Sequence, residues 1–411
     1  GGTPAKMRLC GCGFKCGITE VFSRYGKKTH EKEAVMGEDG RCFPRKDTQA
    51  YRLLELVAVC GEFPAELVYR LAGSTSYKGT VTWLLKKERL LRVYYRDKLR
   101  GYRLGRRART ALLSDNPERF SFYLTGNVDT SLLKSEATRR IRLHRIAEVY
   151  VAMLNAGVTI FRDEKPRVFA PDGDQDRGLE GAAFYSSREV KETGIEAVKI
   201  KGSRMAGVLL SPDGVFLTYN SGPYMAKWDY RAEQRAKAWM QVTLCNGNAG
   251  LGYAPEDVCG LLFGDSLEPF CQILSGADSG ARCFFLLDGS YGHFYYLTND
   301  HKGEVMLRLL CDRDRREELD RILSQGLCAG NPGGVIENDA LDGNGDPVLF
   351  GYLLDIPRIH RFCSALQLQE RHGTLICFDF QREVLERCYG GLVAFEAISF
   401  EKFERRFYPE I

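Results

Sequence analysis

The chain has 411 residues, of which 44% are apolar and 27% are charged, and its 23 Phe and 20 Tyr supply apolar surface for packed cores. This balance is typical of a globular protein of two or three domains and excludes an intrinsically disordered chain. Because no apolar run reaches the roughly 18 residues of a membrane span and no secretory signal pattern is present, we expect a cytoplasmic protein with no membrane partner.

Charge is unevenly distributed along the chain. Residues 1–150 contain 30 Lys or Arg and 16 Asp or Glu, a net charge of +14, whereas the remainder carries −10. Within residues 78–109 there are 12 basic residues against Glu88 and Asp97. Such a basic segment is typical of a protein that binds nucleic acid. The alternative is a solvated basic surface without a partner.

The segment between Thr48 and Leu113 predicts a regular order of elements. Thr48 is placed to cap a first helix that ends at Gly61, and Pro64 is placed in the first turn of a second helix. An alternating β-branched and aromatic run predicts a strand that returns through a turn. In chain order the prediction is helix 48–60, helix 65–73, helix 77–90, strand 90–95, turn 96–101 and strand 102–104.

Three helices followed by a hairpin is the order of a winged helix-turn-helix, in which the third helix enters the major groove and the hairpin contacts the adjacent backbone. The same module serves as a protein–protein interface in many proteins, and that alternative stays open. The predicted DNA contacts are polar residues early on the third helix and cations on the hairpin and just after it: Ser76, Tyr77, Lys78, Thr80, Thr82, Lys86, Arg92, Arg96, Lys98, Arg100, Arg103, Arg106 and Arg107.

A further basic helix is predicted over residues 135–157. Arg139, Arg140, Arg142 and Arg145 lie in its first half. It could connect two domains, dimerise through its apolar side or open the second domain. We expect a packed helix with a solvated arginine side rather than a direct DNA contact.

Three segments resemble the replication-relaxation family: "DTQAYRLLELVAVCGEFPAELVYRL", "LLKKERLLRVYYRDKLRGYRL" and "RLHRIAEVY". The resemblance covers residues 45–155 and extends weakly to about 245. Members of that family occur on conjugative and mobilisable elements of Gram-positive bacteria. The resemblance implies an N-terminal winged helix joined to a region related to restriction-endonuclease-like folds. It also implies a role in replication, DNA processing for transfer, or regulation of the element.

The resemblance raises the question of nuclease activity, which needs acidic ligands for Mg²⁺ on neighbouring strands. Pro212 and Asp213 match a family motif, but the next strand carries Thr218, Tyr219 and Asn220 where a second acid is expected, so we predict a degenerate site. "SPDG" alone predicts a β-hairpin turn, and the spacing of Glu233 and Lys237 predicts a surface helix pair. The residues to test for activity are Glu196, Arg204 and Asp213.

A cysteine cluster opens the sequence. Cys10, Cys12 and Cys16, with His30 downstream, supply the donors of a structural zinc site. Their spacing is not a pair of Cys-x-x-Cys motifs, so a leader with free thiols is the alternative. The other cysteines lie mostly within apolar runs and are expected to be reduced core residues.

From about residue 182, strands and helices alternate, which predicts an α/β region. The strands are expected at 198–210, 215–220, 293–299, 348–355, 374–380 and 393–400, with a hairpin joining 282–288 to 293–299. The helices are expected at 229–244, 315–327, 358–369 and 381–388, and residues 249–264 as a loop entering a helical stretch.

We therefore expect an α+β multidomain protein. The domains are a cysteine-containing leader, a winged helix, a connector helix with linker, and an α/β region that could split near residue 280: 1–44, 45–115, 116–180 and 181–411. The leading hypothesis is a sequence-selective double-stranded DNA-binding protein of a mobile element, which is not a catalyst. Its α/β region would bind a relaxase, a replication protein or a second copy as a homodimer. The alternatives are a metal-dependent nuclease and a ligand-responsive transcription regulator.

Overall fold

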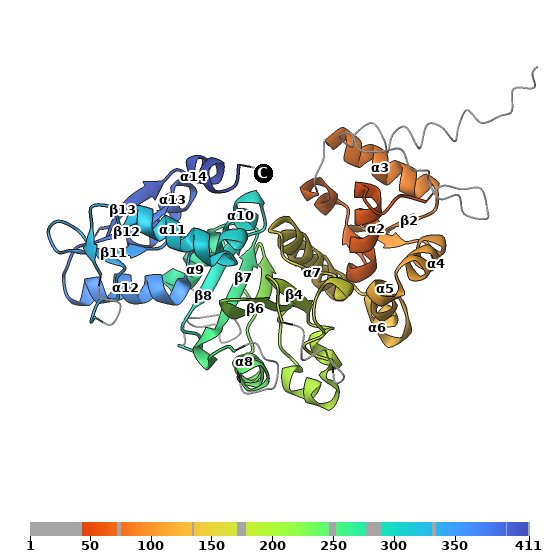
Figure 1. Ribbon diagram of the computed structural model, residues 1–411, viewed down its shortest axis with the longest axis horizontal. Helices are drawn as coiled ribbons and strands as arrows, with labels where there is room; N and C mark the ends of the chain where they lie inside the picture. The colour runs from red at the N-terminus through yellow and green to blue at the C-terminus, as the bar shows by residue number, and fades with distance from the viewer. Residues whose placement is uncertain are drawn as a thin grey trace, which may run out of the picture. The chain divides into compact units, whose positions relative to one another are not determined.

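The described chain contains many helices together with one antiparallel and two mixed sheets, so the fold is of the α+β class. The computed structural model describes residues 43–71, 75–133, 135–170, 178–245, 252–276, 289–330, 334–391 and 393–409. The chain divides into two units between Ala147 and Glu148 (Figure 1). Within the described residues, no helix is long and apolar enough to cross a membrane.

The first unit begins with α2 (Gln49–Cys60), whose ends follow from local chemistry. The Thr48 side chain accepts a hydrogen bond from the Tyr51 amide at 3.2 Å, which satisfies one of the free amides of the first turn. Gly61 ends the helix with a φ of +76°, a conformation that favours glycine. The predicted first helix is confirmed.

After α2 the chain forms the short strand β1 (Phe63–Pro64), the 3₁₀ helix η1 (Glu66–Arg70) and α3 (Thr75–Lys87). The prediction that Pro64 starts a helix is wrong, because Pro64 lies in β1 opposite Gly101. Proline has no backbone N–H and cannot donate a hydrogen bond to a neighbouring strand. It is tolerated here because β1 is the edge strand of the sheet β1-β3-β2, and one side of an edge strand has no neighbour.

The predicted hairpin is confirmed as β2 (Leu91–Arg96) and β3 (Leu99–Leu104). Its turn is shorter than predicted, because Asp97 and Lys98 alone occupy it with φ values of +54° and +59°. Two central residues with positive φ form the turn whose twist matches that of a two-stranded ribbon. The unit continues with α4 (Arg106–Asp115), α5 (Pro117–Leu124), α6 (Gly126–Leu132) and the first part of α7 (Ala137–Asn155).

The second unit contains a mixed sheet in the order β4-β5-β6-β7-β8. The first three strands form an antiparallel meander, and β7 and β8 continue the sheet in parallel. The helix α8 (Tyr230–Cys245) joins β6 to β7, and α9 (Glu268–Ser275) follows β7. The strands are β4 (Ala183–Ser186), β5 (Gly207–Ser211), β6 (Gly214–Gly222), β7 (Val258–Gly264) and β8 (Phe294–Thr298).

The helices α10 (His301–Leu310) and α11 (Arg313–Leu323) lead to a second mixed sheet in the order β13-β12-β11-β10-β9. It repeats the pattern of the first, with an antiparallel meander and then two parallel strands. Its helices are α12 (Ile356–Leu368), α13 (Asp379–Tyr389) and α14 (Phe400–Phe407). Its strands are β9 (Cys328–Ala329), β10 (Ala340–Leu341), β11 (Pro347–Phe350), β12 (Gly373–Phe378) and β13 (Val393–Ile398).

The described part of the second unit therefore consists of two halves with the same order of strands and crossover helices (Figure 1). The first half extends from Ala183 to Thr298, whereas the second extends only from Cys328 to Ile398. Because the connecting segments differ in length, the sequence has no fixed repeat period.

Two sequence expectations for this unit are wrong, and a third falls partly on residues outside those described. Residues 258–264 form a strand rather than a helical stretch. The prediction failed because a short apolar run that is buried on both sides has the same sequence pattern in a strand and in a helix. Residues 190–200 form a 3₁₀ helix where part of a strand was expected. The strand β8 pairs in parallel with β7 across a crossover; its expected hairpin partner, 282–288, lies outside the described residues.

Candidate nucleic-acid interface

The outward face of α3 combines a glycine, an aromatic ring and a lysine spaced one turn apart. Gly79, Trp83 and Lys87 follow each other at intervals of four residues and are all exposed. The Trp83 side chain is 55% exposed, although an indole ring is mostly buried in proteins. The Lys87 ammonium lies 5.0 Å from the centre of this ring. A methyl group added at Gly79 would meet nothing within 4 Å, so the helix backbone is open to a close approach there.

The hairpin has two chemically different faces. Residues opposite each other in an antiparallel pair share a face, so Tyr95 and Arg100 lie on the side of Tyr102. The Lys86 ammonium of α3 lies 5.9 Å from the centre of the Tyr102 ring, which joins this face to α3. We call Trp83, Lys86, Lys87, Tyr95 and Arg100 the α3–hairpin surface.

The opposite face of the hairpin carries Arg92, Arg96 and Arg103. Arg92 lines a cavity of about 370 Å³ together with Arg106 of α4 and with mostly apolar residues at the ends of α2 and α6. Arg103 is engaged inside the unit, because it donates two hydrogen bonds to Glu62. The cations predicted for the hairpin therefore do not form one surface.

The remaining predicted residues are placed as follows. Lys78 donates to the Tyr69 carbonyl at 2.7 Å, Thr80 is half-buried, and Lys98 is exposed at the hairpin tip. Thr82 is buried and donates within α3 to the carbonyls of Lys78 and Gly79, so its hydroxyl does not face outward. Arg107 pairs with Glu88 at 3.4 Å. The side chains of Ser76 and Tyr77 lie outside those the structure describes, as do Cys10, Cys12, Cys16 and His30 of the predicted zinc site.

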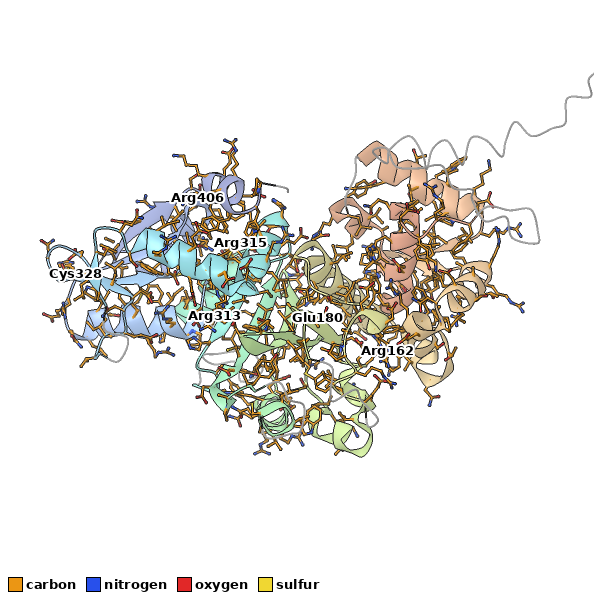
Figure 2. The ribbon with its side chains drawn as sticks, viewed as in Figure 1. Arg162, Glu180, Arg313, Arg315, Cys328 and Arg406 are labelled. Atoms are coloured by element: carbon orange, nitrogen blue, oxygen red, sulfur yellow. The ribbon has the colours of Figure 1, made fainter. Side chains whose placement is uncertain are left out.

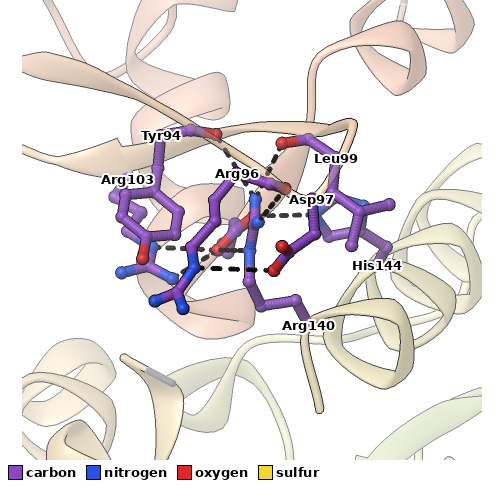
Figure 3. Close-up of polar contacts among 8 residues, drawn as sticks. Tyr94, Arg96, Asp97, Leu99, Arg103, Arg140 and His144 are labelled. Carbon is purple, nitrogen blue, oxygen red and sulfur yellow. Dashed lines mark hydrogen bonds and ion pairs between the residues drawn. The ribbon is translucent and has the colours of Figure 1, made fainter. Parts of the chain in front are cut away.

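A buried ionic network, which the sequence analysis did not anticipate, lies beneath the hairpin (Figure 3). The side chains of Glu62 and Arg140 are both fully buried and are joined by hydrogen bonds of 2.6 and 3.0 Å. Arg103 and His144 donate to the same carboxylate at 2.6 and 2.8 Å. Since an ionised carboxylate only accepts, the proton of this hydrogen bond is on His144 Nε2.

Arg140 also holds the hairpin by its backbone. Its guanidinium donates to the carbonyls of Arg96 at 2.6 Å, Leu99 at 3.0 Å and Tyr94 at 3.3 Å. These carbonyls belong to the end of the hairpin, next to its turn (Figure 3). Arg140 therefore attaches the hairpin tip to α7 with a charge-assisted bond at each carbonyl.

The expectation that the arginines of the 135–157 helix form a solvated side is wrong for Arg140, whereas Arg139 and Arg142 are exposed. The burial of Arg140 could have been recognised from the sequence. Arg140 lies three, four and seven residues before the buried Leu143, His144 and Ala147, which is the spacing of one helix face. An arginine in that stripe predicts a buried acidic partner.

The charge of Glu62 is stabilised by its donors. Burial by itself disfavours the ionised form, but the hydrogen bonds from His144, Arg140 and Arg103 outweigh it and lower the pKa of Glu62 to about 2. The neighbouring glycine makes room for this carboxylate. A methyl group at Gly101 would lie 2.5 Å from Glu62 Oε1.

Of the residues considered for nuclease activity, Asp213 and Arg204 have described side chains, and neither lies in an acidic cluster of the described residues. The "SPDG" turn is confirmed between β5 and β6, and Asp213 pairs with Arg316 at 2.7 Å and with Arg313 at 3.5 Å. Arg204 is exposed, and the Glu196 side chain lies outside those described. Within the described residues no group of three or more His, Cys, Asp or Glu side chains could hold a metal ion.

The prediction that Glu233 and Lys237 form a surface pair is wrong. Glu233 is buried, and it accepts from Ser203 at 2.7 Å and from the Tyr219 hydroxyl at 2.9 Å. Burial raises the pKa of Glu233 above its ordinary value in spite of these donors. The Lys237 ammonium donates to the Ser290 carbonyl instead. The two side chains do not form a surface pair because Glu233 lies on the buried side of α8.

A cavity of about 640 Å³ lies between the two halves of the second unit. His293 Nδ1 and Asp355 Oδ2 are 2.6 Å apart at its wall, and this hydrogen bond raises the pKa of His293. Arg358, near the start of α12, also lines the cavity and donates to Asp339 at 2.6 Å. The cavity lining thus combines apolar side chains with charged groups, many of which are paired with each other.

Comparisons with known proteins supply no identification: no family model, curated protein or solved structure matches this chain. The function is therefore proposed from the chain's own residues and from the resemblance of its sequence segments.

Proposed function

We propose that this chain is a sequence-selective double-stranded DNA-binding protein of a mobile genetic element. In this proposal the first unit is a winged helix, α3 enters the major groove and the hairpin tip contacts the adjacent backbone. The observation that carries it is the α3–hairpin surface, where exposed cations and aromatic rings of a helix and a hairpin are connected by the half-buried Lys86 beside the buried Tyr102 ring.

The element order of the first unit supports this proposal. A helix, a short strand, a helical turn, a second helix and a hairpin follow each other, and the short strand pairs with the hairpin. The resemblance to the replication-relaxation family is a second support, since it covers the same residues. The role we propose is replication, DNA processing for transfer, or regulation of the element.

We further propose that the second unit is a non-catalytic partner-binding region. Its mixed sheets are compatible with a degenerate restriction-endonuclease-like fold, and the pairing of Asp213 with two arginines supports the absence of a metal site there. The partner in this proposal is a relaxase, a replication protein or a second copy of the chain.

The test is duplex binding by the purified chain at several salt concentrations, with fragments from its own gene neighbourhood. We expect tight binding to one fragment and a steep linear fall of log affinity with log salt concentration, because phosphate contacts release counterions. Equal affinity for all fragments would contradict sequence selectivity. Absence of binding at low salt would contradict the whole proposal.

Substituting Gly79→Ala separates stability from binding. The added methyl group has free space, and alanine is favoured over glycine inside a helix by about 0.5–1 kcal/mol. We expect a higher free energy of unfolding together with weaker duplex binding, because the methyl group stands where the backbone of α3 would approach DNA. Urea unfolding and fluorescence anisotropy measure the two effects. Unchanged or tighter binding by the more stable variant would place the DNA elsewhere.

A second candidate function is a ligand-responsive regulator, which the cavity of about 640 Å³ favours because its volume suits a small molecule. Its lining of charged and apolar side chains would suit a ligand that carries both polar groups and apolar surface. Native mass spectrometry of the purified chain distinguishes this candidate: a retained small molecule supports it, and a mass equal to that of the polypeptide does not.

A further inference from the structure

Two cysteines meet where the halves of the second unit are in contact. Cys271 lies on α9 of the first half, and Cys388 lies on α13, the corresponding helix of the second half. These helices pack against each other, and the two sulfur atoms are 2.8 Å apart. Cys271 is buried and Cys388 is half-buried, so the contact is not on an open surface.

We propose that Cys271 and Cys388 form a reversible disulfide when the protein meets a hydroperoxide, and that this bond links the two halves of the second unit. The sulfur–sulfur distance of a disulfide is roughly 2.05 Å, so a small side-chain movement completes the bond. The residues are 117 positions apart in the sequence, so the bond closes a long loop. Closing a long loop removes more conformational entropy from the unfolded chain than closing a short loop, and this stabilises the folded state.

The surroundings decide which sulfur reacts first. The Arg387 guanidinium donates a hydrogen bond to Glu268 at 2.6 Å and interacts with the Cys271 sulfur as well. Burial raises the pKa of the Cys388 thiol well above its ordinary value. In this proposal Cys271, which has the Arg387 cation beside it, attacks the peroxide, and Cys388 resolves the product.

The reaction balances in two steps. The Cys271 thiolate attacks one peroxide oxygen; the O–O bond breaks, leaving a sulfenic acid on Cys271 and an alcohol, or water from hydrogen peroxide. Cys388 then attacks the sulfenic sulfur, forming the S–S bond and releasing water. In total the two thiols lose two electrons and two protons, and the hydroperoxide accepts all four as it is reduced to an alcohol and water, or to two water molecules. A thiol reductant reverses the bond.

The test treats the reduced full-length chain with a small excess of hydrogen peroxide, blocks remaining thiols with iodoacetamide and maps peptides without reduction. We expect a linked pair of peptides containing Cys271 and Cys388, lighter by two hydrogen atoms than their sum and separated by dithiothreitol. Cys388→Ser should abolish the link and leave a sulfenic acid on Cys271 that dimedone traps. Cys363→Ser, a change at another buried cysteine, should retain the link.

Exposed Cys328 on β9 serves as an internal reference for reaction with peroxide (Figure 2). The proposal is overturned if Cys328 is oxidised while Cys271 and Cys388 are both alkylated, or if Cys271 is linked to a different cysteine. If Cys388→Ser does not fold, the wild-type peptide map alone decides. The oxidised wild type should also unfold at a higher temperature than the reduced protein, whereas Cys388→Ser should show no such shift.

Discussion

Substituting Arg140→Met should lower the free energy of unfolding of the first unit by about 3–5 kcal/mol, the cost of breaking a buried ion pair by removing one partner. Glu62 would keep its buried charge with fewer donors, and the carbonyls of Tyr94, Arg96 and Leu99 would lose theirs. Hydrogen exchange of peptides from the first unit in the full-length chain measures this loss directly, without interference from the second unit.

Arg139→Met is the matched control, because Arg139 is the preceding residue of the same helix but is 61% exposed and pairs with Glu136 on the surface. We expect this control to stay within about 0.5 kcal/mol of the wild type. Equal losses from the two substitutions would mean that the Glu62 network does not stabilise the unit.

The same network sets an acid limit to the stability of the first unit. Because the folded state lowers the pKa of Glu62 from 4.5 to about 2, its ionised form stabilises the fold above pH 4.5, and this contribution disappears as the pH falls toward 2. In Arg140→Met, where a main donor is missing, this part of the acid dependence should be smaller. Hydrogen exchange at a series of acidic pH values checks the difference.

Removing three cations from the α3–hairpin surface and its tip should weaken duplex binding on the order of 10²–10³-fold near 0.1 M salt. The variant is Lys87→Ala, Lys98→Ala and Arg100→Ala, whose side chains are all exposed. If each contacts one phosphate, the slope of log affinity against log salt concentration should decrease by about 2.7. Fluorescence anisotropy with one duplex over a salt series gives both quantities.

The control removes the same charge from the other side of the hairpin, as Arg92→Ala, Arg96→Ala and Arg106→Ala. These side chains are exposed as well, so the two variants have the same net charge. We expect the control to keep most of the affinity and slope of the wild type. A similar loss in both variants would indicate attraction by overall charge, and a larger loss in the control would move the interface to the opposite face.

Features whose cause lies within a few residues could be predicted from the sequence. Thr48 and Gly61 delimit α2 by a cap hydrogen bond and a positive φ, and both signals are adjacent to the helix itself. The "SPDG" turn and the β2–β3 hairpin are likewise confirmed, because turn residues and alternating side chains act locally. The basic segment was also visible, since charge is a property of composition.

Features that depend on distant partners were decided by the tertiary structure. The sequence does not tell whether 258–264 is a strand or a helix, because burial on both sides is a property of the finished sheet. It also does not show which hairpin arginines share a face with α3, because strand register sets the face. Glu62 and Arg140 are 78 residues apart, and neither would be stable in the interior without the other. Local chemistry thus determined where helices and turns begin and end. Burial of a charged side chain requires its distant partner to be in place at the same time, so the tertiary structure decided which charges support the fold and which face outward.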